Sequence, residues 1–376
     1  MEALSDYSIA SAPPQPGVRD VRTHLPADCR IRSTFKGLIL FGVSALVYVV
    51  AIAGTAWCHQ WVYKILFVSL TPIAAAALFV IGHDACHGSL TPRPLLNRIL
   101  GRLSLLPSYH PFASWEHSHN GLHHGWTNVR GKDPVYVPFS KAEYDQLPRG
   151  RRALERLYRT PIGLGLLYFI EVWCKYEMFP RRSQFPSRSW ATFQMDRLLV
   201  MCFIVVEALF LVAFNHAAGG QTPLGIAAIL TLGLLMPLAA WNWLMGFVTF
   251  LHHTHPQVPW YRDQTEWCFF AGQVQSVVHV EFPRPIELIL HNIMEHTAHH
   301  VDPKIPLYHL TRSQERLESA YGGEIVTVKW TVGGFRRTLS VCKLFDYSNH
   351  CWLDFQGRRT SPPLLTTNPT QASAAL

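Results

Sequence analysis

Histidine is concentrated in three short clusters of this 376-residue chain, which contains 20 histidines in all. The first cluster has the spacing HxxxH, the second HxxxHH and the third HxxHH. In order along the chain they are His83 and His87; His119, His123 and His124; and His296, His299 and His300. Residues three or four apart are neighbours on one face of a helix, so each cluster can direct two or three imidazoles toward one point. This arrangement is typical of metal binding.

Eight imidazoles exceed the number of ligands that one metal ion accepts. A tetrahedral zinc ion takes four ligands, and a catalytic zinc keeps one position open. The count therefore predicts a site for two metals. Imidazole binds zinc, copper, iron and nickel alike, so the ligand type does not name the metal. A single HxxxH is more often an ordinary helical pair, but three clusters beside long apolar segments favour a metal site.

Composition indicates a membrane protein. Hydrophobic residues make up 49% of the chain and charged residues only 15%, which is too apolar for an ordinary soluble domain. The net charge of +8 comes from Lys and Arg scattered over loops, without a dense basic tract for nucleic acid. Eight cysteines without a CxxC pair argue against a disulfide framework or a zinc ribbon, and fit reduced thiols at a cytoplasmic membrane face.

Four apolar segments have the length of about 20 residues that a membrane-spanning helix needs. They cover residues 35–57, 62–82, 197–218 and 223–251, and the second runs directly into His83. The link inside each pair carries no Lys or Arg, whereas the termini and the middle segment are basic. Because cytoplasmic loops carry the positive charge, we expect two hairpins with both termini and all three clusters on the cytoplasmic side.

The expected fold is an all-α integral membrane protein: four transmembrane helices in two hairpins, with a cytoplasmic helical cap that carries a histidine-rich dinuclear metal site. Residues 161–179 are apolar but interrupted by charges, and are predicted to lie at the membrane interface. Residues 310–321 have a helical pattern, and residues 324–332 alternate like a strand. Glu207 lies inside the third span, where an ionisable group is either functional or paired.

Both ends of the chain are expected to be disordered. Residues 1–33 are rich in Pro, Ser, Ala and Asp and lack the pattern of a signal peptide, which predicts a cytosolic tail. Disorder is also expected from about Arg358 to the last residue.

Further motifs accompany the histidine clusters. WEHSH at 115–119 and DPVYVP at 133–138 flank the second cluster, and FLHHTHPQVP at 250–259 follows the fourth span. HNI at 291–293 and IPLY at 305–308 surround the third cluster. Over residues 35–325 this combination resembles the membrane fatty acid desaturase superfamily, and within it the acyl-lipid omega-6 (delta-12) type and its bacterial relatives. We therefore expect a membrane desaturase domain at 34–325 and a C-terminal extension at 326–376.

The resemblance implies a dinuclear iron centre with nine histidine ligands, one of them outside the clusters. Carried over by position, the ligands are His83, His87, His119, His123, His124, His253, His296, His299 and His300. His253 is the ninth because it occupies the histidine of the family's Q-H-T position at the end of the fourth span. His252 and His255 are its rivals. Adjacent residues on a helix point about 100° apart, so His252 and His253 are not both expected to bind one centre.

The chain departs from the family pattern in two places. The second cluster is HxxxHH where plant-like members have HxxHH, a spacing that resembles the membrane alkane hydroxylases, and the first is HDACH rather than H-E/D-C-G-H. These differences leave the metal site intact but leave open the position of the product and the reaction outcome. His117 and His291 are not expected to be ligands. Candidate acceptors for the second N–H of ligating imidazoles are Asp84, Glu116, Asp133, Glu295 and Asp302.

Removing hydrogen from an unactivated alkyl chain requires an oxidant that only a redox metal supplies, and zinc has no redox chemistry. With iron and O2, the resemblance implies desaturation of a fatty acyl chain. The chain shows neither a ferredoxin-type cysteine pattern nor a haem-binding segment, so we expect a separate ferredoxin or cytochrome b5 with its reductase as electron donor. The acyl chain is expected in an apolar channel, with basic loops for its head group. Candidate lining residues are Trp241, Trp243, Met245 and Phe247.

Other functions remain open. The same site supports hydroxylation, acetylenation or oxidative decarboxylation of a fatty acid to a terminal alkene, which differ in how the substrate is positioned. From a different class, a zinc-dependent membrane hydrolase predicts zinc in the purified protein and activity without O2. A metal carrier is disfavoured, because the clusters lie at or beyond the ends of the spans rather than within them.

Overall fold

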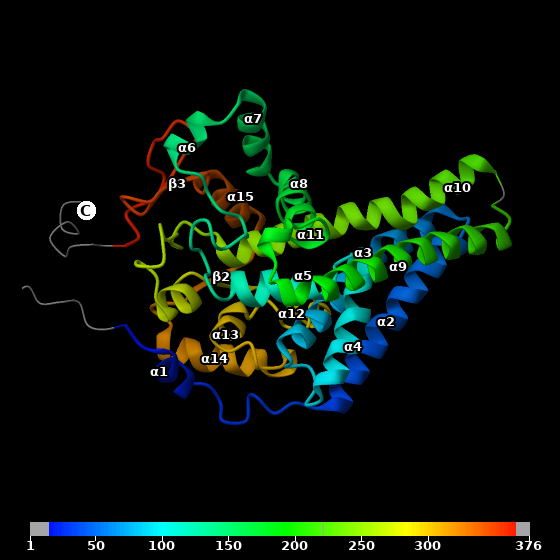
Figure 1. Cartoon of the computed structure of the whole chain (residues 1–376), viewed down its shortest axis with the longest axis horizontal. Coiled ribbons are helices and arrows are strands. Elements are labelled where there is room, and N and C mark those ends of the chain that lie inside the picture. The colour runs from blue at the N-terminus through cyan, green and yellow to red at the C-terminus, as the bar shows by residue number, and fades with distance from the viewer. Residues whose placement is uncertain (1–14, 221, 366–376) are drawn as a thin grey trace, which may run out of the picture.

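Four long apolar helices extend from one side of the molecule in the computed structural model, which describes residues 15–220 and 222–365 (Figure 1). Helix α2 (Thr34–Trp57) packs against helix α3 (Trp61–His87). Helix α9 (Trp190–Ala217) precedes a continuous helical segment made of α10 (Pro223–Leu230), the π-helical turn η6 (Thr231–Leu235) and α11 (Met236–His253). All four predicted spans are therefore helices that are long and apolar enough to cross a membrane.

Two of these helices continue beyond their apolar segments and carry histidines at their ends. Helix α3 extends past the predicted span to His87 and stops where Gly88 turns the chain. Gly88 has a φ of +67°, a left-handed conformation that glycine adopts without a steric penalty, and its N–H bonds to the carbonyl of Ala85 (3.0 Å). His83 and His87 thus lie on the last turns of α3, and His253 is the last residue of α11.

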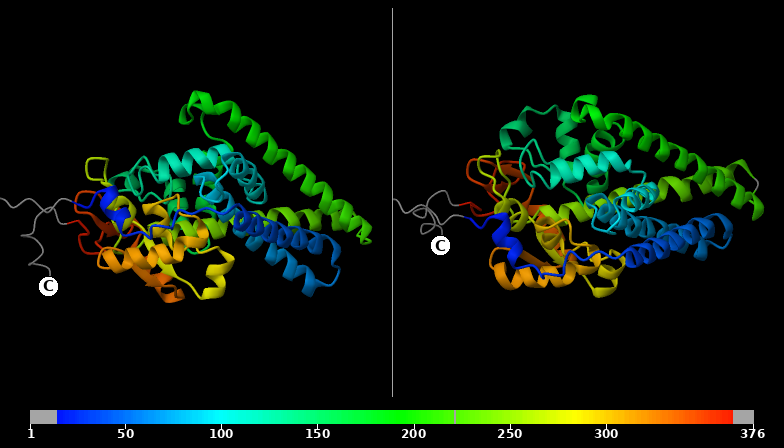
Figure 2. Two further views of the ribbon diagram at one scale, coloured as in Figure 1. Left: turned by 90° about the horizontal axis from the view of Figure 1, so that it is seen from below. Right: turned by 60° about the horizontal axis from the view of Figure 1, so that its bottom comes forward.

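A cap of shorter helices and two small sheets surrounds these helix ends (Figure 1, Figure 2). Strands β1 (Val278–Glu281) and β2 (Val326–Lys329) pair in parallel, and β3 (Leu344–Asp346) and β4 (Cys351–Leu353) pair antiparallel. Among the described residues the helices of the cap are α1 (Val18–Thr23), α4 (Pro94–Leu105), α5 (Phe112–Trp115), the π-helix η2 (Glu116–His123), α6 (Lys141–Gln146), α7 (Arg149–Tyr158), α8 (Gly163–Leu167), the π-helix η3 (Tyr168–Met178), the π-helical turn η7 (Ala271–Gln275), α12 (Arg284–Ile289), α13 (His296–Val301), α14 (Leu310–Tyr321) and α15 (Val332–Val341), joined by short 3₁₀ turns.

Two of the local predictions for the cap are confirmed. Helix α14 has the predicted bounds, and β2 lies inside the segment that was expected to alternate like a strand. The prediction of an all-α fold is correct for most of the chain and wrong for the two small sheets, which together involve four short strands among the described residues. The other three strands have three or four residues each, too few to give a period-two pattern that stands out from a helical background.

The segment at 161–179 forms α8 and η3 and crosses α11 at close range. A Cβ on Gly246 would lie 2.2 Å from the carbonyl oxygen of Leu164, and a Cβ on Gly165 would lie 2.8 Å from the Cα of Trp243. Small residues at a helix crossing let the two backbones approach closely. The two glycines therefore hold α8, and η3 that continues it, against α11.

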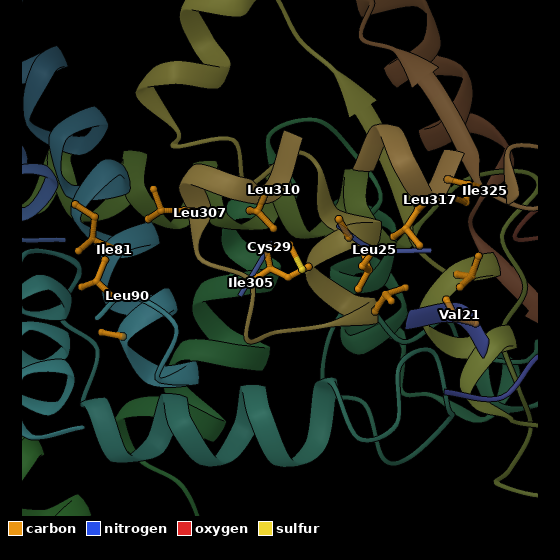
Figure 3. Close-up of a cluster of buried hydrophobic side chains, with 14 of the residues drawn as sticks. Val21, Leu25, Cys29, Ile81, Leu90, Ile305, Leu307, Leu310, Leu317 and Ile325 are labelled. Carbon is orange, nitrogen blue, oxygen red and sulfur yellow. The ribbon is translucent and has the colours of Figure 1, made fainter. Parts of the chain in front are cut away.

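The predicted N-terminal tail is folded from residue 15 onward, which corrects the expectation of disorder up to residue 33. Helix α1 and the loop after it place three apolar side chains in a buried cluster with residues of α13 and α14 (Figure 3). These side chains are Val21, Leu25 and Cys29, spaced four residues apart. The composition predicted a mobile segment, but these three apolar side chains pack against the cap. Burial of these side chains opposes the entropy of the free chain.

The expectation of disorder from about Arg358 is also wrong for the residues that the structure describes there. Arg359 forms a β-bridge with Leu353, and the buried Ser361 accepts a hydrogen bond from the N–H of Trp352 (2.9 Å). The predicted disorder of residues 1–14 and 366–376 lies outside the described residues.

Glu207, predicted to be either functional or paired, is paired. Its carboxyl group on α9 accepts hydrogen bonds from the hydroxyls of Tyr48 on α2 and of Tyr109 between α4 and α5, the latter at 2.7 Å. Each carboxyl oxygen has one of these partners, and the side chain is buried. Glu207 therefore joins three parts of the helical bundle and has a structural role.

Replacing Glu207 by leucine should destabilise the protein. Two buried hydroxyls lose their acceptor, at a cost of about 1–3 kcal/mol for each one left unsatisfied. Thermal unfolding of the purified protein in detergent measures the change. Glu207→Gln keeps a hydrogen-bonding group of the same shape and should unfold closer to the wild type. A leucine variant as stable as the wild type would contradict the structural role.

Candidate metal centre

Nine histidines come together where α3, η2, α11 and α13 meet. Their ring nitrogens form two groups, and within each group the potential ligand atoms lie within 4.8 Å of one another. The first group contains His83, His87, His119, His124 and His299, and the second contains His123, His253, His296 and His300. These are the nine histidines that the sequence analysis named. The second and third clusters each contribute to both groups.

The second cluster serves both groups because its helix is wound more widely than an α-helix. In η2 the N–H of His124 bonds to the carbonyl of His119, five residues earlier (2.9 Å), which is the pattern of a π-helix. In an α-helix five steps of about 100° would leave these side chains about 140° apart. The π-helix brings both into the first group and leaves His123 to the second. It thereby accommodates the HxxxHH spacing.

The ring nitrogens are spaced like ligands of a common ion. In the first group Nε2 of His119 lies 2.8 Å from Nε2 of His83 and 3.1 Å from Nε2 of His124. In the second group Nε2 of His296 lies 3.1 Å from two neighbouring Nε2 atoms. Two nitrogens at about 2.1 Å from one ion and at right angles would be about 3 Å apart. A neutral imidazole carries only one N–H, so converging Nε2 atoms cannot all satisfy one another, and a cation fits each group.

Two side chains orient imidazoles of the second group. Oδ1 of Asp133 accepts a hydrogen bond from Nδ1 of His123 (3.0 Å), and Oε1 of Gln273 accepts one from Nδ1 of His300 (2.7 Å). Each bond holds the hydrogen on Nδ1, so that the Nε2 lone pair faces the group. Asp133 was among the acceptors expected from the sequence. Gln273 was missed, because nothing in the sequence distinguishes this amide from other polar residues outside the clusters.

The other four carboxylates proposed as acceptors do not reach a ligand candidate at hydrogen-bond distance. Asp84 comes nearest, with Oδ1 3.8 Å from Nδ1 of His83. Glu295 accepts a hydrogen bond from a threonine hydroxyl, Asp302 pairs with arginine, and Glu116 is exposed. Spacing in the sequence placed them near the clusters but did not show which way they point.

Histidines outside the two groups have other contacts. His252 lies on α11 and stacks on the ring of His296, with the ring centroids 3.6 Å apart. His117, His255 and His291 contact other polar groups of the protein. Of the three candidates for the ninth position, His253 is the one that joins a group among the described residues.

Burial keeps five of the imidazoles in the form that binds metal. Loss of hydration lowers the pKa of each of them well below the usual 6.5, and neighbouring imidazoles lower it further. These five, all outside the long apolar helices, are His119, His124, His296, His299 and His300. A neutral imidazole has a free lone pair, so protons compete with a metal only at distinctly acidic pH.

An apolar cavity of about 270 Å³ adjoins the centre. Five of the nine histidines, from both groups, are part of its wall, and most other lining side chains are apolar. Trp241, Met245 and Phe247 line it, as the sequence analysis expected. Trp243 does not belong to the described lining: its ring is partly exposed, and its indole N–H bonds to the carbonyl of Pro161 (2.8 Å).

Fold and site together define a membrane-associated protein that can hold two metal ions beside an apolar cavity. Comparison with known families identifies it further. The family model described as fatty acid desaturase matches residues 55–331, which is most of the chain. The protein therefore belongs to the fatty acid desaturase family and is an oxidoreductase of lipid metabolism.

Curated relatives agree with this membership. The chain is 27% identical over 334 residues to the chloroplastic omega-6 fatty acid desaturase of Spinacia oleracea, covering 88% of this chain and 70% of the relative. It is 27% identical over 341 residues to the sn-1 oleoyl-lipid 12-desaturase of Picosynechococcus, covering 90% and 92%. It is 29% identical over 311 residues to the sn-1 acyl-lipid omega-3 desaturase (ferredoxin) of Synechocystis, covering 81% of each.

Asp133→Asn should weaken metal binding. Asp133 accepts hydrogen bonds from Nδ1 of His123 and from the N–H groups of Asn128 and Val135, and an amide cannot accept them all. Loss of such a partner typically costs about 10–100-fold in metal affinity. Metal titration of the purified protein, compared with the exposed Asp145→Asn as control, measures the effect. Equal affinity in the two variants would show that Asp133 does not orient His123.

Proposed function

We propose that this protein introduces a double bond into a fatty acyl chain, in an O2-dependent reaction at a dinuclear iron centre. The proposed ligands are His83, His87, His119, His124 and His299 for one ion and His123, His253, His296 and His300 for the other. The observation that carries the proposal is the meeting of both histidine groups on one apolar cavity, in a chain of the fatty acid desaturase family.

Iron ions supply the one-electron chemistry and the activation of O2 that side chains lack. In the overall reaction two hydrogens from adjacent methylenes, two external electrons and two protons reduce O2 to two molecules of water. The protein positions the reactants. Asp133 and Gln273 hold Nδ1–H groups so that Nε2 lone pairs face the centre. The apolar wall excludes water and places an alkyl chain beside His83 and His119.

The two electrons are proposed to come from a separate donor of the ferredoxin type, with its reductase. The name of the Synechocystis relative gives ferredoxin as its donor, and a related omega-3 desaturase of Nostoc carries the same designation. Cytochrome b5 is the alternative donor. Turnover with each purified donor distinguishes them.

The membrane arrangement is proposed as two hairpins, α2 with α3 and α9 with α10–α11, with the histidines and both termini on the cytoplasmic side. His59, in the link after α2, contacts the carbonyl of Ala218, in the link after α9, so the two links lie together away from the histidines. Neither link carries Lys or Arg, which supports placing them on the far side. We assign residues 34–325 to the desaturase domain and 326–376 to a C-terminal extension.

A sister reaction at the same site is the second candidate, favoured by the HxxxHH spacing and the π-helix that accommodates it. Hydroxylation, acetylenation and oxidative decarboxylation to a terminal alkene each leave the metal centre unchanged and differ in product. A zinc-dependent hydrolase would contain zinc and act without O2.

Expression in a bacterial host tests the proposal directly. Gas chromatography with mass spectrometry, of lipid extract and headspace together, should reveal a new internal double bond that requires O2. His124→Ala removes one imidazole of the first group and should abolish the product while the protein stays in the membrane fraction. A hydroxy acid or a volatile alkene would move the protein to a sister reaction. Full activity of His124→Ala would refute the site assignment.

The assignment of the ninth ligand has a matched test in two adjacent histidines. His253→Phe removes a ring nitrogen from the second group, whereas His252→Phe retains a ring that can stack on His296. We expect the first variant to lose iron and the second to keep the wild-type iron content, because only His253 directs its nitrogen into a group. Elemental analysis measures iron per chain. The opposite pattern would make His252 the ligand.

A further inference from the structure

The wall of the cavity contains a buried carboxyl group that the proposed chemistry does not use. Glu177, on η3, lines the cavity and is fully buried, and its Oε1 accepts a hydrogen bond from the hydroxyl of Ser118 (2.5 Å). Within the described parts of the chain, its Oε2 has no hydrogen-bond partner. Leaving such an atom unpaired costs free energy, so its presence in an apolar cavity indicates a ligand.

Two indole N–H groups of the same cavity wall also lack an acceptor among the described residues. Trp115 and Trp241 are buried, line the cavity and pack on Phe79, each with ring centroids 4.7 Å from it. Buried indole N–H groups usually find a partner. Ser118, whose hydroxyl bonds to Glu177, follows Trp115 by one helical turn, and its Oγ is 3.4 Å from the backbone carbonyl of Trp115. These shared neighbours place the two indoles and the carboxyl group in one part of the cavity wall, which we call the polar end.

This polar end lies deep in the protein and beside the metal centre. Trp115 stacks on the ring of His119, with the centroids 4.6 Å apart and the planes 15° apart. The exposed lining residue Ile286 (39% exposed) lies elsewhere, on α12, and the lining residues Val248 and Thr249 on α11 are half-buried. A chain that enters between α11 and α12 therefore reaches the polar end with its leading group.

We propose that Glu177, Trp115 and Trp241 form a subsite for the carboxyl group of the substrate, so that a free fatty acid enters the cavity head first. This rests on the proposed function and names its substrate class. A carboxylic acid offers an O–H to Oε2 of Glu177 and a carbonyl oxygen to an indole N–H, whereas the methyl end of the chain offers neither. No Lys or Arg lines this cavity in the described structure, so the site suits the neutral acid rather than the carboxylate.

Head-first entry determines which carbons of the acid are oxidised. The carbons beside His119 and His83 are then counted from the carboxyl end, because that end is fixed by hydrogen bonds while the tail extends toward the opening. Changing the length of the acid changes only how far the tail reaches. The oxidised carbons should keep a constant distance from the carboxyl carbon.

Binding measured by calorimetry on the purified, metal-loaded protein tests the subsite without turnover. The wild type should bind dodecanoic acid more tightly than dodecane. Trp241→Phe and Glu177→Leu should each weaken binding of the acid by about tenfold, the effect of one lost buried hydrogen bond, and leave binding of dodecane unchanged. Glu177→Gln retains a donor and an acceptor and should restore binding of the acid.

Matched controls lie on the same helices but outside the cavity lining. Trp243→Phe on α11 and Glu171→Gln on η3 should bind both ligands like the wild type. Iron content and thermal unfolding verify that each variant is folded. If Trp241→Phe and Glu177→Leu bind the acid as the wild type does, or lose acid and alkane equally, the subsite is refuted.

Products from decanoic, dodecanoic and tetradecanoic acids give the second readout. A modified position at constant distance from the carboxyl carbon supports head-first entry, and one at constant distance from the methyl end overturns it. If none of the acids is oxidised although their binding depends on Trp241 and Glu177, the proposed function fails and the subsite stands. If Trp241→Phe and Glu177→Leu oxidise the acids as the wild type does, the subsite fails and the proposed function stands.

Discussion

The structure depends on nine imidazoles, eight of them buried and that of His124 half-buried, whose ring nitrogens face one another. Without a cation this arrangement is costly, because lone pairs converge in a region from which water is largely excluded. The protein holds the rings there by rigid means: two long helices that end at the centre, a π-helix, and the short helix α13. The side chain of Lys304, just after α13, donates to the carbonyl of His87 (2.5 Å), and Asp302 pairs with Arg30 of the N-terminal segment. The contact of Lys304 with His87 holds the third histidine cluster, on α13, close to the first, on α3.

The cavity follows from the same geometry. Helix α11 supplies His253 at its end and Trp241, Met245 and Phe247 along one side, so the wall of the cavity leads to the metal centre. The close crossing with α8 keeps η3 on the opposite side. Since the proposed ligands are all imidazoles, we expect the reaction outcome to depend on which carbon of the chain this wall places beside the centre. We therefore expect the side chains of the cavity wall to matter for specificity as much as the proposed ligands matter for chemistry.

Hydropathy and histidine spacing are local signals, and the features that they predicted agree with the structure. All four long helices were predicted because a run of about 20 apolar residues is typical of a membrane-spanning helix. The nine histidines were named because residues four apart share a helix face, with the family resemblance adding His253. The prediction of a disordered N-terminal tail was wrong from residue 15 onward. Val21 and its neighbours are ordered because they pack on the cap, against residues hundreds of positions away in the chain. The prediction that Trp243 lines the cavity was wrong, because helical phase alone does not show which side of α11 faces α8.

The sequence by itself determined the apolar helices, the presence of a polyhistidine site and membership of a family, because each rests on residue type and short-range spacing. Only the tertiary structure decided how the histidines divide into two groups, since that division pairs residues from different clusters and depends on the π-helical winding of η2. It also selected Asp133 and Gln273 as partners of the rings and brought Glu177 and the indoles of Trp115 and Trp241 into the wall of one cavity. Hydrogen bonds and cavities form between segments that are distant in the chain. No local sequence pattern predicts which way the side chains of such segments point.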